Sequence, residues 1–320
     1  MTKRTFRQAF NTKFHSDTAY QDFRNSGSSN RVEKFTLKNG REVFKLEAQQ
    51  KGYLQFVDGV VLRYLEKDED VVHSFIKQRS TLTAVRVHSG SKYFFLTDIE
   101  QFYSNIKRSD VIDVFTRNVT NIPISDIANH IEFLADITTH NNCLPVGFPT
   151  SPMLSNAFLF DFDERVKAFC ESKNLVYTRY ADDIIISSPD TGIESTLRDI
   201  VQKLLKEHAS ESLILNNSKT KITHIGNKVK LLGLVVLPNG RITIDSKYKK
   251  HIEVTLHFFA NDTDKYRDLL AKHFKGSEHS LFGLLHYANS IDPSYIDKLQ
   301  RKYGAFALRD FMENKWHDKG

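Results

Sequence analysis

The stretch VYTRYADDIIIS, Val176–Ser187, decides the fold. Two short runs of strong strand formers flank Ala181, Asp182 and Asp183, a pattern typical of two strands joined by a tight turn. Adjacent side chains on a strand point to opposite faces, but at the tip of a hairpin they can converge. The stretch therefore predicts a hairpin that carries two carboxylates at its tip. The simpler alternative is a pair of solvated turn acids, because aspartate is common in turns.

A third carboxylate, Asp98, ends another apolar run, KYFFLTDI at Lys92–Ile99. If this strand lies beside the hairpin, three carboxylates form a site of hard oxygen ligands that suits Mg²⁺. Two such ions, about 3.5–4 Å apart, can activate an attacking hydroxyl and stabilise a leaving pyrophosphate. The acids therefore favour nucleotidyl transfer over two solvated turn residues.

Tyr103 follows Asp98 by five positions. A bulky ring there could lie beneath the sugar of an incoming nucleotide and exclude a 2′-hydroxyl. An ordinary core aromatic is the alternative.

The segment LPVGFPTSP, Leu144–Pro152, predicts a loop followed by the start of a helix. Pro152 suits the first helical turn, and Thr150 or Ser151 can cap it. A glycine in such a loop allows a nucleotide or template to approach the backbone closely. A plain helix N-terminus is the alternative.

Composition and charge narrow the class of protein. The 320 residues allow two domains, and 40% hydrophobic with 26% charged residues excludes wholesale disorder. The two cysteines lack zinc-like spacing, and no apolar leader or membrane-length run is seen, so we expect a cytoplasmic protein without a membrane partner.

The net charge is +6, and Glu211–Lys250 alone holds eight lysines and arginines against two acids. This local surplus permits a nucleic-acid partner, and a solvated basic face is the alternative.

The rest of the chain predicts a mixed fold with a helical tail. Asn39-Gly40 and Pro238-Asn239-Gly240 each predict a hairpin turn. Residues 46–66 and 192–209 predict helices, residues 1–32 a short helix and a loop, and the chain from Lys247 a series of helices broken at Gly276 and near Pro293. Two roles are open for the N-terminal aromatic residues Phe10, Phe14 and Tyr20. They could stack on RNA, or they could pack their helix against neighbouring elements.

Five segments together resemble the palm motifs of reverse transcriptases, in their order and spacing. They are Phe95–Tyr103, Leu144–Asn156, Val176–Ser187, Asn217–Lys221 and Leu231–Val236. With Gly283–Pro293 and Lys302–Gly304 in the tail, the chain is similar to retron-type bacterial reverse transcriptases or closely related defence-associated ones. The resemblance implies an α+β right-hand polymerase: an N-terminal segment and fingers at 1–95, a palm with an antiparallel sheet and helices on one face at 96–245, carrying a fingers segment at about 108–143, and an α-helical thumb at 246–320.

The resemblance also implies roles for single residues. The implied catalytic residues are Asp98, Asp182 and Asp183. They would bind the two metal ions together with the main-chain oxygen of Ile99. The implied nucleotide-binding residues are Arg41, Tyr103, Gly147, Pro149, Ser151 and Lys219, with Lys38 as a further candidate. The implied primer and template contacts are Leu232, Gly233, Lys247, Lys249 and Lys250.

Three positions depart from the family pattern. Val146 stands where these enzymes usually carry glutamine, and valine cannot donate a hydrogen bond near the incoming sugar. The segment Ala84–His88 keeps the histidine of a retron element but not its asparagine and alanine, and Leu231-Leu232-Gly233 replaces Val-Thr-Gly. The chain therefore resembles a divergent retron enzyme or a neighbouring defence enzyme.

The implied function is RNA-directed DNA synthesis with two Mg²⁺ ions, for which Mn²⁺ could substitute, and dNTPs. The implied template, and also primer, is a cognate structured non-coding RNA, and the product is RNA-linked single-stranded DNA used in anti-phage defence with a separate effector protein. Two alternatives stay open: a defence reverse transcriptase that makes protein-primed, untemplated or repeat DNA, and a non-catalytic RNA-binding scaffold.

Overall fold

Strands β4 (Val176–Tyr180) and β5 (Asp183–Ser188) pair in antiparallel register, with Tyr180 opposite Asp183. Ala181 and Asp182 are therefore the two residues of the connecting turn. Ala181 is in the left-handed region, with φ 56°, which a two-residue hairpin turn requires of its first residue. The hairpin predicted from the sequence is confirmed.

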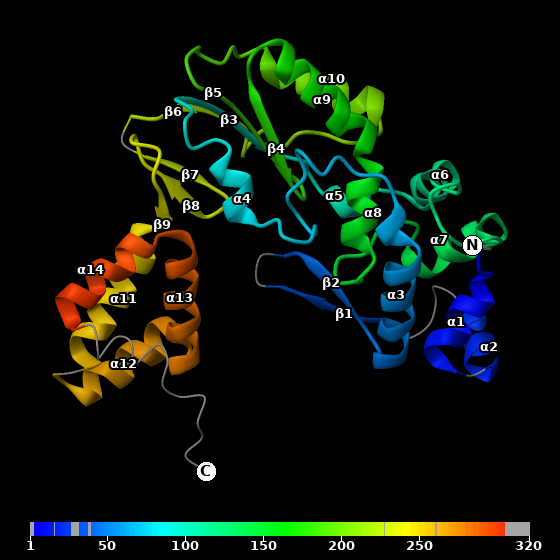
Figure 1. Ribbon diagram of the computed structural model, residues 1–320, viewed down its shortest axis with the longest axis horizontal. Helices are drawn as coiled ribbons and strands as arrows, with labels where there is room; N and C mark the ends of the chain where they lie inside the picture. Colours follow the sequence, from blue (N-terminus) through cyan, green and yellow to red (C-terminus); the bar gives the residue numbers. More distant parts are fainter. Residues whose placement is uncertain are drawn as a thin grey trace. The chain divides into compact units, whose positions relative to one another are not determined.

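The hairpin belongs to a four-stranded sheet of order β4-β5-β3-β6. Strand β3 (Tyr93–Asp98) lies between β5 and β6 (Lys221–His224), so its end comes beside the turn. Helix α9 (Phe160–Ser172) packs on β4, and α10 (Leu197–His208) packs on α9 (Figure 1). The predicted strand at 92–99 is confirmed.

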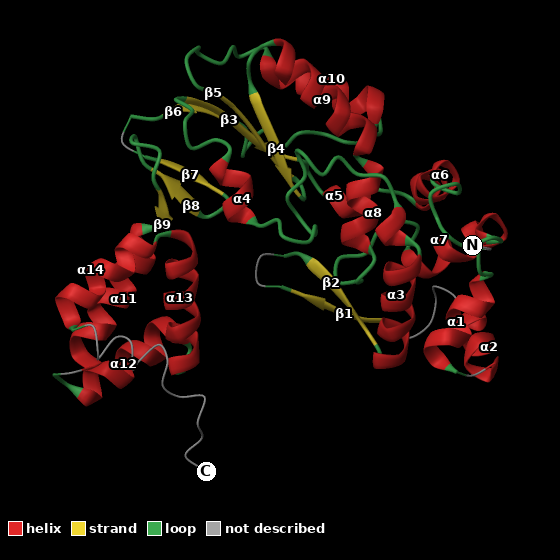
Figure 2. Ribbon diagram, in the orientation of Figure 1, coloured by secondary structure: helices red, strands yellow, loops and turns green. Residues whose placement is uncertain are grey.

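The structure is a computed structural model that describes residues 3–15, 17–26, 32–37, 40–226, 228–259 and 261–304. The chain forms two compact units: one holds residues 1–80, 94–188 and 192–222, and the other holds 81–93, 189–191 and 223–320. Helices and antiparallel strands come in separate runs along the chain (Figure 2), which makes it an α+β fold as predicted.

The first unit contains the sheet and most of the helices. Its remaining helices are α1 (Phe6–Phe14), α2 (Asp17–Asn25), α3 (Ala48–Val60), α5 (Phe102–Asn105), α6 (Arg108–Arg117), α7 (Ile131–Thr138) and α8 (Ser151–Phe158), with 3₁₀ turns at Leu62–Tyr64 and Ile127–His130. A separate hairpin joins β1 (Val32–Thr36) to β2 (Glu42–Leu46). This is the hairpin predicted around residue 40, although Lys38 and Asn39 lie outside the described residues.

The second unit combines a small sheet with a helical tail. The sheet has the order β7-β8-β9, formed by Val229–Leu231, Leu234–Val236 and Ile242–Ile244. The helices are α4 (Thr81–Arg86), α11 (Ser246–Phe259), α12 (Thr263–Phe274), α13 (Glu278–Ile291) and α14 (Pro293–Tyr303). The predicted breaks at Gly276 and Pro293 are confirmed.

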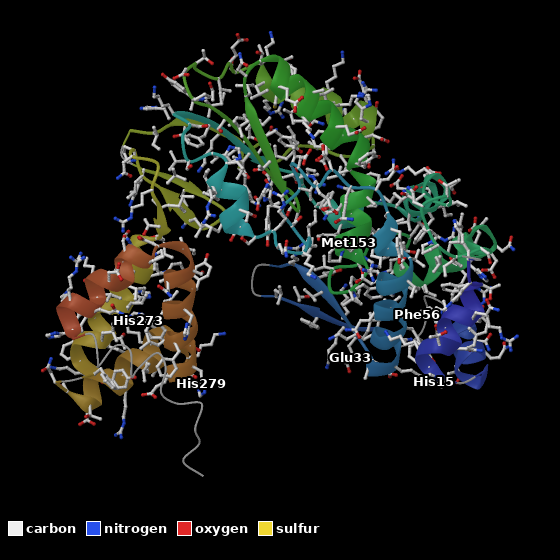
Figure 3. The ribbon with its side chains drawn as sticks, viewed as in Figure 1. His15, Glu33, Phe56, Met153, His273 and His279 are labelled. Atoms are coloured by element: carbon white, nitrogen blue, oxygen red, sulfur yellow. The ribbon has the colours of Figure 1, made fainter. Side chains whose placement is uncertain are left out.

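The N-terminal segment differs from the single short helix predicted for it. It forms two helices, and their aromatic rings pack on α3: Phe10 is fully buried and lies 5.3 Å from Phe56 between ring centroids (Figure 3). Tyr20 is also buried, and Phe14 stacks on Phe10 at 4.4 Å. These rings therefore serve the core and are not free to stack on RNA.

Two local predictions were incomplete. The run Leu231–Val236 precedes the predicted turn at Pro238-Asn239-Gly240 and is itself divided, because Leu232 and Gly233 turn the chain between β7 and β8. Thr150 occupies the N-cap position of α8 but makes no side-chain capping bond, whereas the Ser151 hydroxyl donates to the Pro145 carbonyl at 2.7 Å.

The two compact units group the chain differently from the fingers, palm and thumb division at 1–95, 96–245 and 246–320, which stays a prediction. In the described part of the chain, no helix combines the length and the apolar character needed to cross a membrane.

Candidate active site

Asp98 is brought beside the β4–β5 hairpin by backbone hydrogen bonds on both sides of its strand. The Ile99 N–H donates to the Asp182 carbonyl at 3.1 Å, and the Asn216 N–H donates to the Asp98 carbonyl at 2.8 Å. The Asp98 side chain is only 3% exposed. The chain therefore places Asp98 beside the distant pair Asp182 and Asp183 at one end of the sheet.

The three carboxylates repel one another. Burial raises the pKa of Asp182 above its usual value, and repulsion from Asp98 adds to the shift, while Arg41 and Lys219 oppose it. Partial loss of water, followed by repulsion from Asp182 and Asp98, raises the pKa of Asp183 to about 6 although this residue is exposed. Such clustered negative charge favours the binding of a cation.

Lys219 neutralises one of these charges. Its Nζ lies 2.5 Å from Asp98 Oδ2, and this hydrogen bond is the main reason why the pKa of Lys219 is raised. The other oxygen, Asp98 Oδ1, is buried and has no hydrogen-bond partner. Because a buried carboxylate oxygen without a partner is costly, Asp98 Oδ1 is suited to a ligand that the protein itself does not supply.

Divalent metal ions fit this site in their chemistry. The donors are all oxygens, as Mg²⁺ prefers, and one of them is an unsatisfied buried atom. Among the described residues, no three His, Cys, Asp or Glu side chains are already gathered as a closed ligand cluster.

Ile99 has its backbone oriented toward the hairpin. Its N–H donates to Asp182, and the N–H and C=O of an extended residue leave the chain on the same side. We therefore expect the Ile99 carbonyl to face the turn as well, where the sequence predicts a main-chain metal ligand.

Tyr103 and Arg41 lie together next to the acids. The Arg41 guanidinium is 5.9 Å from the centre of the Tyr103 ring, and Asp182 and Arg41 both contribute to the field at the Tyr103 hydroxyl. Burial raises the pKa of Tyr103, with a hydrogen bond to Ser155 opposing that rise. The structure thus brings both predicted nucleotide contacts to the aspartates.

The loop before α8 is packed against the β1–β2 hairpin. The Phe44 N–H donates to the Val146 carbonyl at 2.8 Å. Gly147 has φ 108°, and a Cβ there would lie 2.3 Å from the Phe44 carbonyl oxygen. Gly147 is therefore required for a close approach of protein backbone, whereas the sequence predicted an approach of nucleotide or template.

Ser151 and Pro149 shape this loop from within. Ser151 is buried and its hydroxyl is bonded inside the loop, while Pro149 is half-buried. Val146 contributes its carbonyl to the hairpin contact, which does not depend on its side chain.

The predicted primer and template residues all lie in the second unit. Leu232 and Gly233 form the turn between β7 and β8, with φ 48° and 82°, the positive values that a type I′ turn needs at both positions. Lys247 and Lys250 are exposed on α11. Lys249, by contrast, pairs with Asp292 at 3.6 Å and lies 4.6 Å above the Tyr295 ring, so its charge is used to join α11 to α14.

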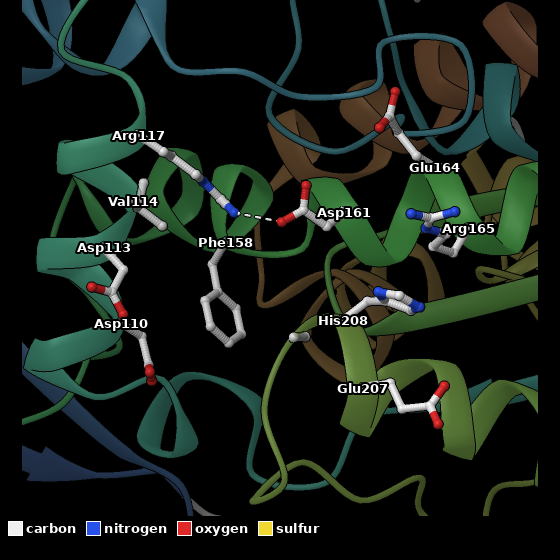
Figure 4. Close-up of a pocket in the computed structure, with 11 residues that line it drawn as sticks. Asp110, Asp113, Val114, Arg117, Phe158, Asp161, Glu164, Arg165, Glu207 and His208 are labelled. Carbon is white, nitrogen blue, oxygen red and sulfur yellow. Dashed lines mark hydrogen bonds and ion pairs between the residues drawn. The ribbon is translucent and has the colours of Figure 1, made fainter.

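A cavity of about 450 Å³ in the first unit is separate from the aspartates (Figure 4). It lies among α6, α9 and α10 and is lined by Asp110, Asp113, Glu164, Glu207 and other residues, including an Arg117–Asp161 ion pair at 2.8 Å. The residues that line it do not include Asp98, Asp182 or Asp183.

Sequence reasoning missed a set of buried polar residues beneath the hairpin, namely Ser74, Asn156, Asp163 and Arg179. Their only signal was an arginine inside the strand VYTRY and an aspartate inside the apolar segment after Leu154. Charged side chains are almost never buried without a partner of opposite charge. The arginine and the aspartate could therefore have been predicted to pair with each other.

Comparisons with known proteins show the family to which the chain belongs. A model of the family described as reverse transcriptase (RNA-dependent DNA polymerase) matches residues 49–236, more than half of the chain. Retron Ec73 reverse transcriptase of Escherichia coli is 30% identical over 261 residues, which cover 77% of this chain and 76% of that protein. Retron Ec86 reverse transcriptase of Escherichia coli is 29% identical over 237 residues, covering 72% and 68%. A truncated apo telomerase from Candida tropicalis gives a TM-score of 0.48 at 12% identity, over 68% of this chain and 55% of its own.

From the family model and the retron relatives, the chain belongs to the reverse transcriptase family and is an RNA-directed DNA polymerase of the retron type.

Proposed function

We propose that the chain copies a cognate structured non-coding RNA into single-stranded DNA at the site formed by Asp98, Asp182 and Asp183. One observation supports this proposal most strongly. Asp98 has a buried carboxylate oxygen without a hydrogen-bond partner, and the two aspartates near it, Asp182 and Asp183, have raised pKa values. Two bound Mg²⁺ ions, or Mn²⁺ in their place, would activate the attacking hydroxyl and neutralise the leaving pyrophosphate.

The residues around the acids would bind the incoming dNTP. Arg41 presents a guanidinium that suits the triphosphate oxygens, and Tyr103 beneath it would exclude a 2′-hydroxyl. The raised pKa of Lys219 keeps this side chain charged, so it would offer a positive charge near the leaving pyrophosphate. Gly147, Pro149 and Ser151 would hold the loop that carries the adjoining part of the pocket.

The second unit would hold the RNA–DNA duplex. The turn at Leu232 and Gly233 would contact the primer end, and Lys247 and Lys250 would contact phosphates without reading sequence. Lys249 would act mainly by fixing the helices that present them. The RNA would also supply the primer, and the RNA-linked DNA would act in anti-phage defence together with a separate effector protein.

The test is DNA synthesis by the purified protein with its co-purifying RNA, dNTPs and Mg²⁺. Asp98→Asn removes the charge that a metal ion would bind, and we expect synthesis to fall by about 10³-fold or more. Asp190→Asn is the matched control, because Asp190 is exposed and pairs only loosely with Lys92. Full synthesis by Asp98→Asn would exclude the proposed site.

A further inference from the structure

The left-handed turn at the tip of the catalytic hairpin is held by two side chains, one from strand β4 of the hairpin and one from a segment outside it. The Ala181 N–H donates to Ser74 Oγ at 2.8 Å, and the Ala181 carbonyl accepts from Arg179 Nη1 at 2.9 Å. Ala181 has φ 56°, a region that a residue with a Cβ adopts only when its surroundings impose it. Both backbone groups of the residue before Asp182 therefore have fixed partners.

Arg179 is itself fixed by a fully buried carboxylate. Its guanidinium donates to both oxygens of Asp163, through Nε at 2.8 Å and Nη2 at 2.5 Å, and Nη1 also reaches Asn156 Oδ1 at 3.1 Å. Arg179, Asp163 and Asn156 are each 0% exposed. The two-pronged contact leaves the guanidinium one orientation, in which Nη1 points at the turn.

Ser74 is fixed from the other side. The segment before it runs alongside β4, since the Arg179 N–H donates to the Val71 carbonyl at 2.8 Å and the His73 N–H donates to the Arg179 carbonyl at 2.9 Å. The Asn156 side chain donates to the Ser74 carbonyl at 2.9 Å. Asn156 thus connects the two residues that hold the turn.

We propose that Ser74 and Arg179 are positioning residues that impose the left-handed conformation of Ala181 and thereby aim the carboxylates of Asp182 and Asp183. The inference rests on the proposed role of these aspartates. Fold stability alone does not call for this arrangement, because a well-packed apolar cluster usually replaces a buried ion pair without loss of stability. What an apolar cluster cannot supply is a donor for the Ala181 carbonyl and an acceptor for its N–H.

The test compares Ser74→Ala and Arg179→Lys with Tyr177→Phe. Ser74→Ala removes the acceptor of the Ala181 N–H, and Arg179→Lys keeps a charge for Asp163 but cannot reach both Asp163 and the turn. Tyr177→Phe is the control, because the Tyr177 hydroxyl donates to Asp163 at 2.7 Å and does not touch the turn. Each of the three loses at least one buried hydrogen bond, so all three should lower the unfolding temperature.

The two test variants should differ from the control variant in kcat and in metal binding. Ser74→Ala and Arg179→Lys should lower kcat about 10- to 100-fold with little change in the KM for dNTP, since displaced reacting groups slow the chemical step. They should also weaken the binding of Mn²⁺ to the nucleotide-free protein, followed by electron paramagnetic resonance, by about tenfold. Tyr177→Phe should keep both values near those of the unaltered protein.

Asp182→Asn, measured in parallel, separates two kinds of failure. If Asp182→Asn keeps full synthesis, the proposed site itself is wrong. If Asp182→Asn loses synthesis while Ser74→Ala and Arg179→Lys change only the unfolding temperature, the positioning role is wrong and the site stands. Should Ser74→Ala not fold, Arg179→Lys decides the question by the same two measurements.

Discussion

Asp98 has one carboxylate oxygen bonded to Lys219 and the other buried without a partner. The sequence could identify Asp98 as the acid that ends an apolar strand, and the Asp182-Asp183 pair as a hairpin tip. It could not show that Lys219 would occupy one Asp98 oxygen, because that contact joins residues 121 positions apart. Nor could it show Ser74, whose role depends on the three-dimensional path of the segment beside β4.

Asp183 should make the metal-free protein less stable at neutral pH. Its folded pKa of about 6 lies above the ordinary 3.8, so the folded state binds the proton more tightly and loses stability as pH rises through this range. Asp183→Asn should therefore raise the free energy of unfolding at pH 7 by about 1 kcal/mol, after allowance for the exposure of the group.

Thermal unfolding in a chelating buffer measures this effect. The gain from Asp183→Asn should disappear near pH 4, about where the unfolded carboxyl also takes up its proton. Asp190→Asn, at an exposed site, should be nearly neutral at both pH values. An equal gain at both pH values would mean that charge repulsion is not the cause.

Tyr103 should decide which sugar is accepted. Tyr103→Ala removes the ring beside Arg41, and ribonucleotide incorporation relative to deoxyribonucleotide should rise about 10- to 100-fold. Tyr103→Phe keeps the bulk of the ring and loses only the hydroxyl, so its discrimination should stay close to that of the unaltered protein. Unchanged discrimination in Tyr103→Ala would assign Tyr103 to the core alone.

At the scale of elements, the sequence predicted what is encoded locally. The β1–β2 and β8–β9 hairpins follow from their turn residues, and α13 and α14 are separated as the proline predicted. The missed features are set by tertiary contacts: the turn at Leu232 lies within an unbroken apolar run, and the second N-terminal helix has a polar sequence stabilised by aromatic packing.

Gly147 joins two elements, and its substitution tests that junction. In Gly147→Ala the new Cβ would meet the Phe44 carbonyl at 2.3 Å, on a backbone with φ 108°. We expect a loss of about 2 kcal/mol or more in unfolding free energy. We also expect a higher KM for dNTP, because the displaced β1–β2 hairpin carries Arg41.

Gly52→Ala is the control for this substitution. Gly52 lies within α3 with nothing within 4 Å of its added Cβ, so alanine should stabilise by about 0.5–1 kcal/mol. A Gly147→Ala protein with unaltered stability and unaltered KM would show that the junction does not position the hairpin.

At the scale of the whole molecule, the basic surplus of Glu211–Lys250 is divided among several uses. Lys219 neutralises Asp98 in the first unit, and Arg241 and Lys249 pair with Asp292 within the second. Lys247 and Lys250 remain exposed, as the proposed phosphate contacts require. Composition could locate the positive charge but could not separate structural cations from exposed ones, because the two kinds have the same sequence signature.

Sequencing the nucleic acid that co-purifies with the protein from cells tests whether this polymerase copies a structured RNA at its three aspartates. The unaltered protein should carry a compact RNA joined to a discrete single-stranded DNA, and Asp182→Asn/Asp183→Asn should carry the RNA without the DNA. The same DNA on both proteins would show that the aspartates do not synthesise it. A repeat sequence bound covalently to protein would show that the DNA is not a copy joined to a structured RNA.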